Sequence, residues 1–284
     1  MTFALVLVSA FLHALWNALL RLEQDKDRAL VCAVGVASLF ALVVAAIRYQ
    51  VTGVPWFATT ESLLWTLLAG FLEWLYFTAL ARALTTGSLG VVYTVSRGGA
   101  VLVIWPVSVV LFHEPLTLTA GIGSAVICAG LAASSHIAGS DNRTAQRGAL
   151  GWSVACATAI AGYHLAYKAG LGTGASPSAS FGVSLAFSTL INVARLGTAG
   201  RRVARQILRT RLLRVLAMGI VCGGSFLMLI EALAGDGAGM VLTLRNTSVL
   251  FAIGLAAAIG ERPRSFQVIG AILVAAGAVL MAWP

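Results

Sequence analysis

Two stretches of this chain, 147 positions apart, repeat one another. Residues 114–130 read EPLTLTAGIGSAVICAG and residues 261–277 read ERPRSFQVIGAILVAAG, so that Glu114 aligns with Glu261 and Gly130 with Gly277. Near the start of each half, ALWNALLR (14–21) aligns at the same shift with AGYHLAYK (161–168). A repeat with a period of about half the chain indicates that the fold is built from two copies of one unit.

The composition places both copies in a membrane. The chain is 59% hydrophobic and only 10% charged, and its mean hydropathy is +0.93. Soluble domains have about a quarter of their residues charged, so this chain cannot cover a water-facing surface. The net charge of +9 does not indicate nucleic-acid binding, because the basic residues lie between apolar runs. Membrane lipid is their expected partner.

Ten stretches are long and apolar enough to cross a bilayer, which takes about 20 residues per helix. A β-barrel is excluded because no stretch alternates polar and apolar residues. The predicted spans are 3–20, 29–47, 63–81, 88–112, 117–136, 148–167, 178–196, 215–234, 237–259 and 267–283.

Ten spans in two repeats give five spans per repeat. Because five is odd, the second copy enters the membrane from the opposite side, and an axis in the membrane plane relates the two copies. The sequence therefore predicts an all-α integral membrane fold of ten transmembrane helices, arranged as two inverted five-helix repeats around a central cavity. The first repeat covers 1–138, a linker covers 139–147, and the second repeat covers 148–284, all within one integral domain.

The distribution of basic residues predicts the orientation in the membrane. The even-numbered connections carry only Arg48 and Lys168, whereas most Lys and Arg residues fall on the odd-numbered ones. The odd connections are therefore predicted to be cytoplasmic and both termini to be non-cytoplasmic. One basic stretch, RRVARQILRTRLLR (201–214), is predicted to form an amphipathic helix that anchors to the inner leaflet. The basic residues of the odd connections are Arg21, Lys26, Arg28, Arg82, Arg143, Arg147, Arg195, Arg201, Arg202, Arg205, Arg209, Arg211, Arg214, Arg262 and Arg264.

Polar residues inside the predicted spans are candidates for a binding site, because an ionisable group in a membrane needs a partner or a role. His13, Trp16 and Asn17 share one face of the first span. At the shifted positions, Tyr163, His164 and Tyr167 share a face of the sixth. Two such faces opposed across a cavity would hold an amphipathic ligand, with rings supplying apolar area and polar groups fixing orientation. The alternative is that each residue hydrogen-bonds a neighbouring helix in a satisfied core.

The third, fourth and ninth spans add charged candidates. Glu73 shares a face with Tyr76, and Tyr93 shares a face with Arg97. One interpretation is a structural Glu73–Arg97 ion pair. In the other, Arg97 or Arg245 holds a substrate carboxylate, while Glu73 or Glu231 faces an ammonium group. Protonatable His and Glu side chains would also permit proton coupling, although a facilitator needs none. The predicted substrate-binding residues are His13, Trp16, Asn17, Glu73, Tyr76, Tyr93, Arg97, Tyr163, His164, Tyr167 and Arg245.

The arrangement of the repeats resembles a known family. Each half carries a Gly-rich fourth span that runs into a Glu-containing turn (FHEPLT and IGERPRS) and then into a Gly-spaced fifth span. These elements resemble EamA-type members of the drug/metabolite transporter superfamily, and within it the chain is most similar to the YddG-type bacterial exporters of aromatic and other amino acids. The resemblance implies a ten-helix inverted repeat with a central cavity, and export of small metabolites by alternating access.

The resulting prediction is a secondary transporter in the bacterial inner membrane that exports small amphipathic metabolites, amino acids foremost, including aromatic ones. The alternatives are a multidrug or organic-cation exporter on the same fold and, less favoured, an intramembrane enzyme. Against an enzyme, the sequence has no nucleophile elbow, HExxH motif or dinucleotide-binding loop. We expect no cofactor, no metal, no nucleic-acid partner, and a monomer, since each chain contains both halves.

Overall fold

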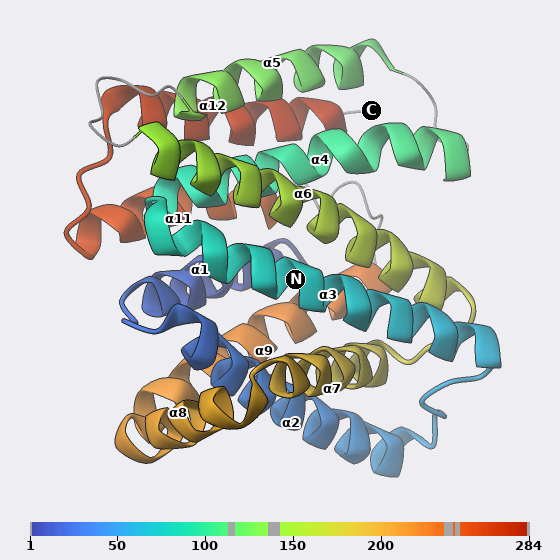
Figure 1. The fold of residues 1–284 in the computed structure, drawn as a ribbon. Helices are drawn as coiled ribbons and strands as arrows, with labels where there is room; N and C mark the ends of the chain where they lie inside the picture. Colours follow the sequence, from blue (N-terminus) through green and yellow to red (C-terminus); the bar gives the residue numbers. More distant parts are fainter. Residues whose placement is uncertain (1, 113–116, 136–142, 236–240, 242–244, 283–284) are drawn as a thin grey trace.

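The fold is a bundle of long helices. The computed structural model describes residues 2–112, 117–135, 143–235, 241 and 245–282, and within them the β-structure is one isolated antiparallel bridge, Phe57–Ala175 (Figure 1). The helices are α1 (Thr2–Arg21), α2 (Lys26–Thr52), α3 (Thr60–Thr86), α4 (Leu89–Phe112), α5 (Leu118–Ser135), α6 (Arg143–Gly172), α7 (Pro177–Arg195), α8 (Gly197–Thr210), α9 (Leu212–Gly235), α11 (Ser248–Ala258) and α12 (Ser265–Ala282).

Seven of these helices, α1, α2, α3, α4, α6, α7 and α9, are long and apolar enough to cross a membrane. Three more apolar helices, within α5, α11 and α12, have 10–17 residues each. The predicted spans therefore correspond to helices, with one partial exception. The predicted span 237–259 is described mainly in its second part, as α11, and most of its first part lies outside the described residues. The turn at Glu114 also lies outside them.

Capping residues fix several helix ends. The Asp25 side chain accepts a hydrogen bond from the backbone N–H of Arg28 and so caps the start of α2. Gly53 ends that helix in the left-handed region, at φ 68°, where a glycine avoids the Cβ strain of other residues. Thr59 caps α3 in the same way as Asp25 caps α2. The predicted linker 139–147 differs from the structure in its second part, because α6 already begins at Arg143.

The connections between helices lie at two ends of the bundle. In Figure 1 the α1–α2, α3–α4 and α11–α12 connections lie at the left end, and the α2–α3 and α6–α7 connections lie at the right end. This arrangement gathers the basic residues of the odd connections at one end. Arg21 there forms an ion pair with Glu261, and Arg195 forms one with Asp27.

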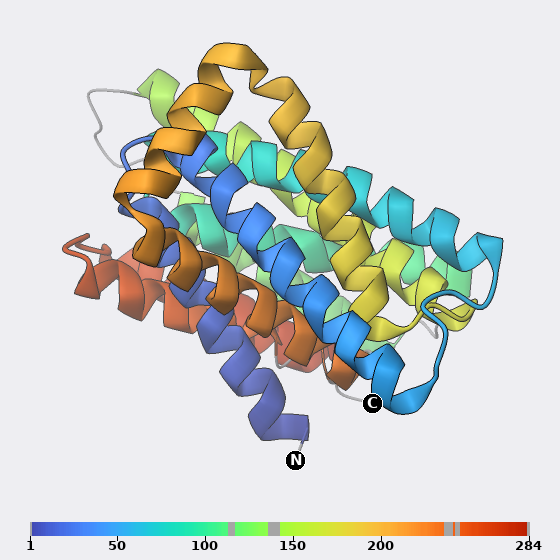
Figure 2. The same ribbon diagram turned by 90° about the horizontal axis from the view of Figure 1, so that it is seen from below.

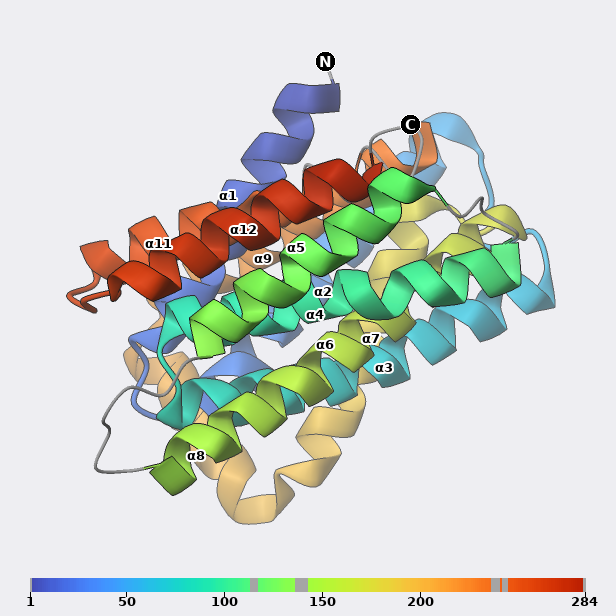
Figure 3. The same cartoon turned by 90° about the horizontal axis from the view of Figure 1, so that it is seen from above.

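The two halves pack in a matched way. Helix α3 lies along α6, and the helix at the corresponding place in the second half, α9, lies along α1. Likewise α4 contacts α6 and α11 contacts α1, while α2 contacts its counterpart α7. Figure 3 views the face formed by α5 and α12, and Figure 2 views the opposite side, where α2, α7, α8 and α9 lie in front.

Helices α5 and α12 touch backbone to backbone through glycines. A Cβ added to Gly130 would lie 2.7 Å from the carbonyl oxygen of Gly270, and one added to Gly277 would lie 2.6 Å from that of Gly123. Glycine permits this close approach because it has no side chain. The pairing is antiparallel, since Gly123 meets Gly277 and Gly130 meets Gly270. The two contacts are equivalent under the repeat, because Gly123 and Gly130 correspond to Gly270 and Gly277 at a shift of 147 residues.

Helix α8 confirms the predicted amphipathic helix but corrects its bounds. The helix covers Gly197–Thr210 instead of 201–214, and Arg214 belongs to α9. Its buried residues, Gly200 and Ala204, face the protein, and the Cys32 thiol of α2 donates a hydrogen bond to the Ala204 carbonyl over 3.4 Å. The buried face of α8 therefore packs on α2, because the α7–α8 turn folds the helix back over the start of α2. Anchoring of its arginines to the inner leaflet stays a prediction.

Candidate functional site

The polar face predicted on α1 is fully buried. His13, Trp16 and Asn17 each have 0% of their surface exposed. Trp16 Nε1 lies 3.3 Å from His13 Nδ1, and Asn17 Nδ2 donates to the His13 carbonyl oxygen over 2.8 Å. Trp16 thus contacts the His13 ring, whereas Asn17 bonds the His13 backbone. The helical spacing predicted this face correctly, because 3.6 residues per turn brings positions i, i+3 and i+4 together.

The aromatic face predicted on α6 is buried beside it. Tyr163 and Tyr167 are essentially unexposed, and His164 is buried. Phe226 of α9 connects the two faces, because its ring centroid lies 5.1 Å from that of His13 and 6.2 Å from that of Tyr163. The faces of α1 and α6 therefore belong to one aromatic cluster.

Helix α3 supplies a second connection between the same two faces. The Tyr76 ring lies 5.7 Å from Tyr163, and the neighbouring Phe77 ring lies 6.2 Å from Trp16. These centroid separations are typical of favourable aromatic pairs. Rings from α1 and α3 in the first half and from α6 and α9 in the second half thus form one buried aromatic cluster.

Glu73 on α3 is held by a tyrosine, not by an arginine. The Tyr167 hydroxyl donates to Glu73 Oε1 over 2.7 Å and also contacts the hydroxyl of Ser184 on α7. Oε2 of Glu73 is buried with no hydrogen-bond partner. The carboxyl group therefore keeps one oxygen available inside the bundle.

Arg97 on α4 faces α1. Its guanidinium contacts Nε2 of His13 and lies 5.7 Å from the centroid of the Tyr93 ring, a cation–π distance. The predicted Glu73–Arg97 ion pair is therefore wrong: no such pair forms among the described residues. The reason is the packing of the helices, because α4 turns Arg97 toward His13 while α3 turns Glu73 toward α6 and α7.

Arg245 contacts residues of α1 and α9. It is 1% exposed, and its Nη1 donates to Ser9 Oγ and, over 3.4 Å, to the Ser225 carbonyl oxygen. Its Cζ atom lies 5.4 Å from the centroid of the Phe226 ring. Nε and Nη2, which form the other edge of the guanidinium, have no hydrogen-bond partner. Hydrogen bonds therefore hold Nη1 of Arg245 in place, while the donors of Nε and Nη2 have no acceptor.

Donors and positive charge are in excess in this cluster. A neutral imidazole has one acceptor nitrogen, so His13 cannot accept from both Arg97 and Trp16. Arg245 adds two further unpaired donors. Of the predicted site residues, two carry guanidinium groups and one, Glu73, carries a carboxyl group. Buried charges and donors are costly unless paired, so the cluster is suited to a ligand with an anionic acceptor group.

The other carboxylate considered from the sequence lies elsewhere. Glu231 forms an ion pair with Arg48 at a partly exposed position, with a third of the Glu231 side chain accessible. Glu231 therefore has its own cation outside the buried cluster. In the part of the chain that the structure describes, no group of three or more His, Cys, Asp or Glu side chains is placed to hold a metal ion.

Sequence reasoning missed several residues of the cluster. Ser9 precedes His13 by one helical turn, so its position on the same face was a usable signal. Phe226 and Ser184 gave no such signal, because each is one apolar or small residue among many on its helix. Only packing between helices shows that Phe226 stacks on Phe181 at 5.2 Å and also contacts His13.

The second half of the chain matches a known family. No curated protein is matched by the chain as a whole. A solved structure, titled only as the crystal structure of a protein, is similar in fold, with 17% sequence identity, a TM-score of 0.59, and coverage of 98% of this chain and 96% of that one. Residues 147–283 match the EamA-like transporter family. The chain therefore contains an EamA-like transporter family domain in its second half.

Proposed function

We propose that the protein is a secondary transporter that exports small amphipathic metabolites, amino acids including aromatic ones foremost, by alternating access. An EamA-like domain implies a multi-pass membrane protein that transports drugs or metabolites. The observation that carries the substrate proposal is the buried cluster in which Arg97 and Arg245 are surrounded by aromatic rings and lack a carboxylate partner among the described residues.

Two inverted five-helix repeats are the proposed architecture. The antiparallel glycine pairs of α5 and α12 support it, because an exchange of two antiparallel helices requires a two-fold axis perpendicular to both of them. The matched packing of α3 on α6 and of α9 on α1 supports it as well. The charge distribution supports cytoplasmic odd connections and non-cytoplasmic termini in a bacterial inner membrane.

Arg245 is the proposed carboxylate-binding residue. Its unpaired Nε and Nη2 lie on one edge of the guanidinium, which is the geometry that binds a carboxylate through two parallel hydrogen bonds. Ser9 and the Ser225 carbonyl hold the other edge, so the fork is already oriented. Phe226 and Tyr163 would contact an aromatic or aliphatic side chain.

Glu73 is the proposed partner of the ammonium group. Its Oε2 is buried and unpaired, and Tyr167 fixes the orientation of its carboxyl group through Oε1. Arg245 would pair with the carboxylate of a zwitterion, and Glu73 would pair with its ammonium group. The alternative substrate, an organic cation, is less suited to this cluster, because two guanidiniums would repel it while one carboxyl group attracts it.

Counterflow in proteoliposomes tests the proposal. Vesicles loaded with unlabelled phenylalanine should take up labelled phenylalanine faster than protein-free vesicles. External phenylalaninamide and phenethylamine, which keep the ring and the amine but lack a carboxylate, should compete poorly. Competition by a lipophilic cation, but not by amino acids, would support the organic-cation exporter instead. Absence of flux with every compound, combined with chemical conversion of a lipid or peptide, would contradict transport altogether.

A further inference from the structure

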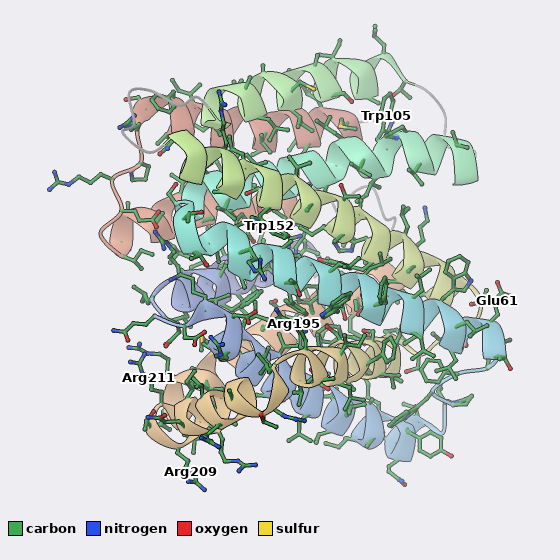
Figure 4. The ribbon with its side chains drawn as sticks, in the orientation of Figure 1. Glu61, Trp105, Trp152, Arg195, Arg209 and Arg211 are labelled. Carbon is green, nitrogen blue, oxygen red and sulfur yellow. The ribbon has the colours of Figure 1, made fainter. Side chains whose placement is uncertain are left out.

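The corner between α8 and α9 carries an arginine-rich surface that the transport site does not use. Helix α8 packs on α2 through its buried residues, so its arginines face away from the protein. In Figure 4, Arg209 and Arg211 lie at the lower left, at the end of the bundle opposite Glu61. The exposed arginines of this corner are Arg201, Arg202, Arg205, Arg209, Arg211 and Arg214.

A pocket opens in one part of this surface. Its volume is about 620 Å³, and six consecutive residues, 209–214, line it: three arginines, Thr210 and two leucines. Leu213 is 82% exposed and Leu212 is half exposed. The pocket thus combines cationic donors with apolar side chains that are half exposed or more.

A buried carboxylate fixes two of the three arginines. Glu23, in the α1–α2 connection, is 4% exposed. Its Oε2 accepts from Nη1 of Arg211 over 2.7 Å, and its Oε1 accepts from Nη1 of Arg214 over 3.1 Å. One carboxylate neutralises one of these charges, so the lining keeps a net positive charge of about two when Arg209 is included. Each guanidinium is held through Nη1 and has further N–H donors, and the Arg211 and Arg214 side chains are 40% and 50% exposed.

We propose that this pocket binds the phosphate group of an anionic phospholipid from the leaflet at this end of the bundle. Arginine is suited to this because its planar fork binds phosphate oxygens in pairs. Leu212 and Leu213 favour a lipid over free phosphate, since beside a bound headgroup they would contact its glycerol and acyl groups. The fixed positions of Arg211 and Arg214 distinguish a built site from general attraction to a charged surface.

The competing explanation is diffuse attraction between anionic lipid and all the exposed arginines of the corner. The chain offers a matched control, because three arginines line the pocket and three lie on α8 outside it. The triple substitution R209Q/R211Q/R214Q therefore removes the same formal charge as R201Q/R202Q/R205Q. Diffuse attraction predicts equal effects from both, whereas a pocket predicts that only the first has a large effect.

Native mass spectrometry of the full-length protein in detergent measures the difference. The probes are phosphatidylglycerol, phosphatidylcholine and inorganic phosphate. Wild type and R201Q/R202Q/R205Q should retain phosphatidylglycerol in preference to phosphatidylcholine, and R209Q/R211Q/R214Q should lose that preference by about tenfold or more. Equal losses in the two triple variants would overturn the pocket, and displacement of the lipid by inorganic phosphate at equal concentration would overturn the lipid assignment.

Two further variants keep the test independent of folding. R211Q and R214Q leave Glu23 buried without a partner, which destabilises a fold, so E23Q/R209Q/R211Q/R214Q removes that carboxylate as well. R209Q alone leaves both Glu23 bonds in place. Both variants should melt near the wild-type temperature without lipid, and R209Q should still weaken phosphatidylglycerol binding several-fold. Wild-type lipid preference in R209Q and in the quadruple variant would refute the site.

Discussion

The substitution G130A adds one methyl group, which should push α5 and α12 slightly apart. A Cβ there would lie 2.7 Å from the Gly270 carbonyl oxygen and 2.9 Å from the backbone nitrogen of Val274. Both atoms belong to the backbone of α12, so no side chain can turn away to make room. Ordinary contact begins near 3.4 Å, so the helices must move apart by about 0.7 Å. A gap of that size forfeits a quarter to a half of the dispersion energy of each contact it opens.

We therefore expect G130A to lower the free energy of unfolding by about 1–3 kcal/mol, the usual range for an overpacked contact. G277A should cost a similar amount, because its Cβ would meet the Gly123 carbonyl oxygen at 2.6 Å and the backbone nitrogen of Ile127 at 2.9 Å. Val274 and Ile127 are themselves 147 residues apart, so the two substitutions test the same contact from both halves.

The control is Gly121, which lies in the same helix as Gly130. An added Cβ at Gly121 meets no atom within 4 Å, so G121A should change stability by less than about 1 kcal/mol, in the stabilising direction. Steric-trap unfolding in bicelles measures all three variants against wild type. Equal stability of G130A and G121A would refute the close glycine packing. A large cost for G130A with none for G277A would refute the two-fold relation between the helices.

Three further outcomes are expected. R245K keeps the charge but loses the two donors on the Nε–Nη2 edge, so the initial rate of phenylalanine counterflow should fall by about tenfold or more. The initial rate for an amine without a carboxylate should not change. Y167F removes the bond to the Glu73 carboxyl group and should cost about 1–3 kcal/mol of stability in the same unfolding assay, because a buried acceptor is left unpaired. The Arg21–Glu261 ion pair is partly exposed, so a double-mutant cycle built from R21A and E261A should find a coupling free energy below about 1 kcal/mol. A coupling well above that value would contradict the weak contribution expected of this pair.

Helical periodicity explains why much of the buried cluster could be predicted. The spacing of His13, Trp16 and Asn17 determines that they share a face, whatever the face contacts. An ionisable residue in an apolar span must also face the protein interior, which identified Glu73 and Arg97. Both arguments use one helix at a time, and both conclusions agree with the burial of these side chains in the structure.

The partners of these residues could not be predicted in the same way, because they depend on how helices are rotated and shifted against one another. Glu73 and Arg97 both face inward, yet one meets Tyr167 and the other meets His13. Phe226 contacts both faces without any pattern in the sequence around it. The packing of α8 on α2 likewise depends on the turn at Gly197, whose φ is 62°.

The repeat explains the scaffold but not the polarity of the buried cluster. At a shift of 147 residues, Glu73 corresponds to Ile220, so its carboxyl group has no acidic counterpart. Arg97 and Arg245 are 148 residues apart and therefore lie within one position of corresponding to each other. A cluster with true two-fold symmetry would offer a ligand two equivalent orientations. Because Glu73, held by Tyr167, is the one carboxyl group among the predicted site residues, a zwitterion would have one preferred orientation. The glycine contacts of α5 and α12 are symmetric, whereas the charges at the centre are not, so the two are separate features. Substitutions at the glycines should change stability. Substitutions at the charged residues should change substrate selection.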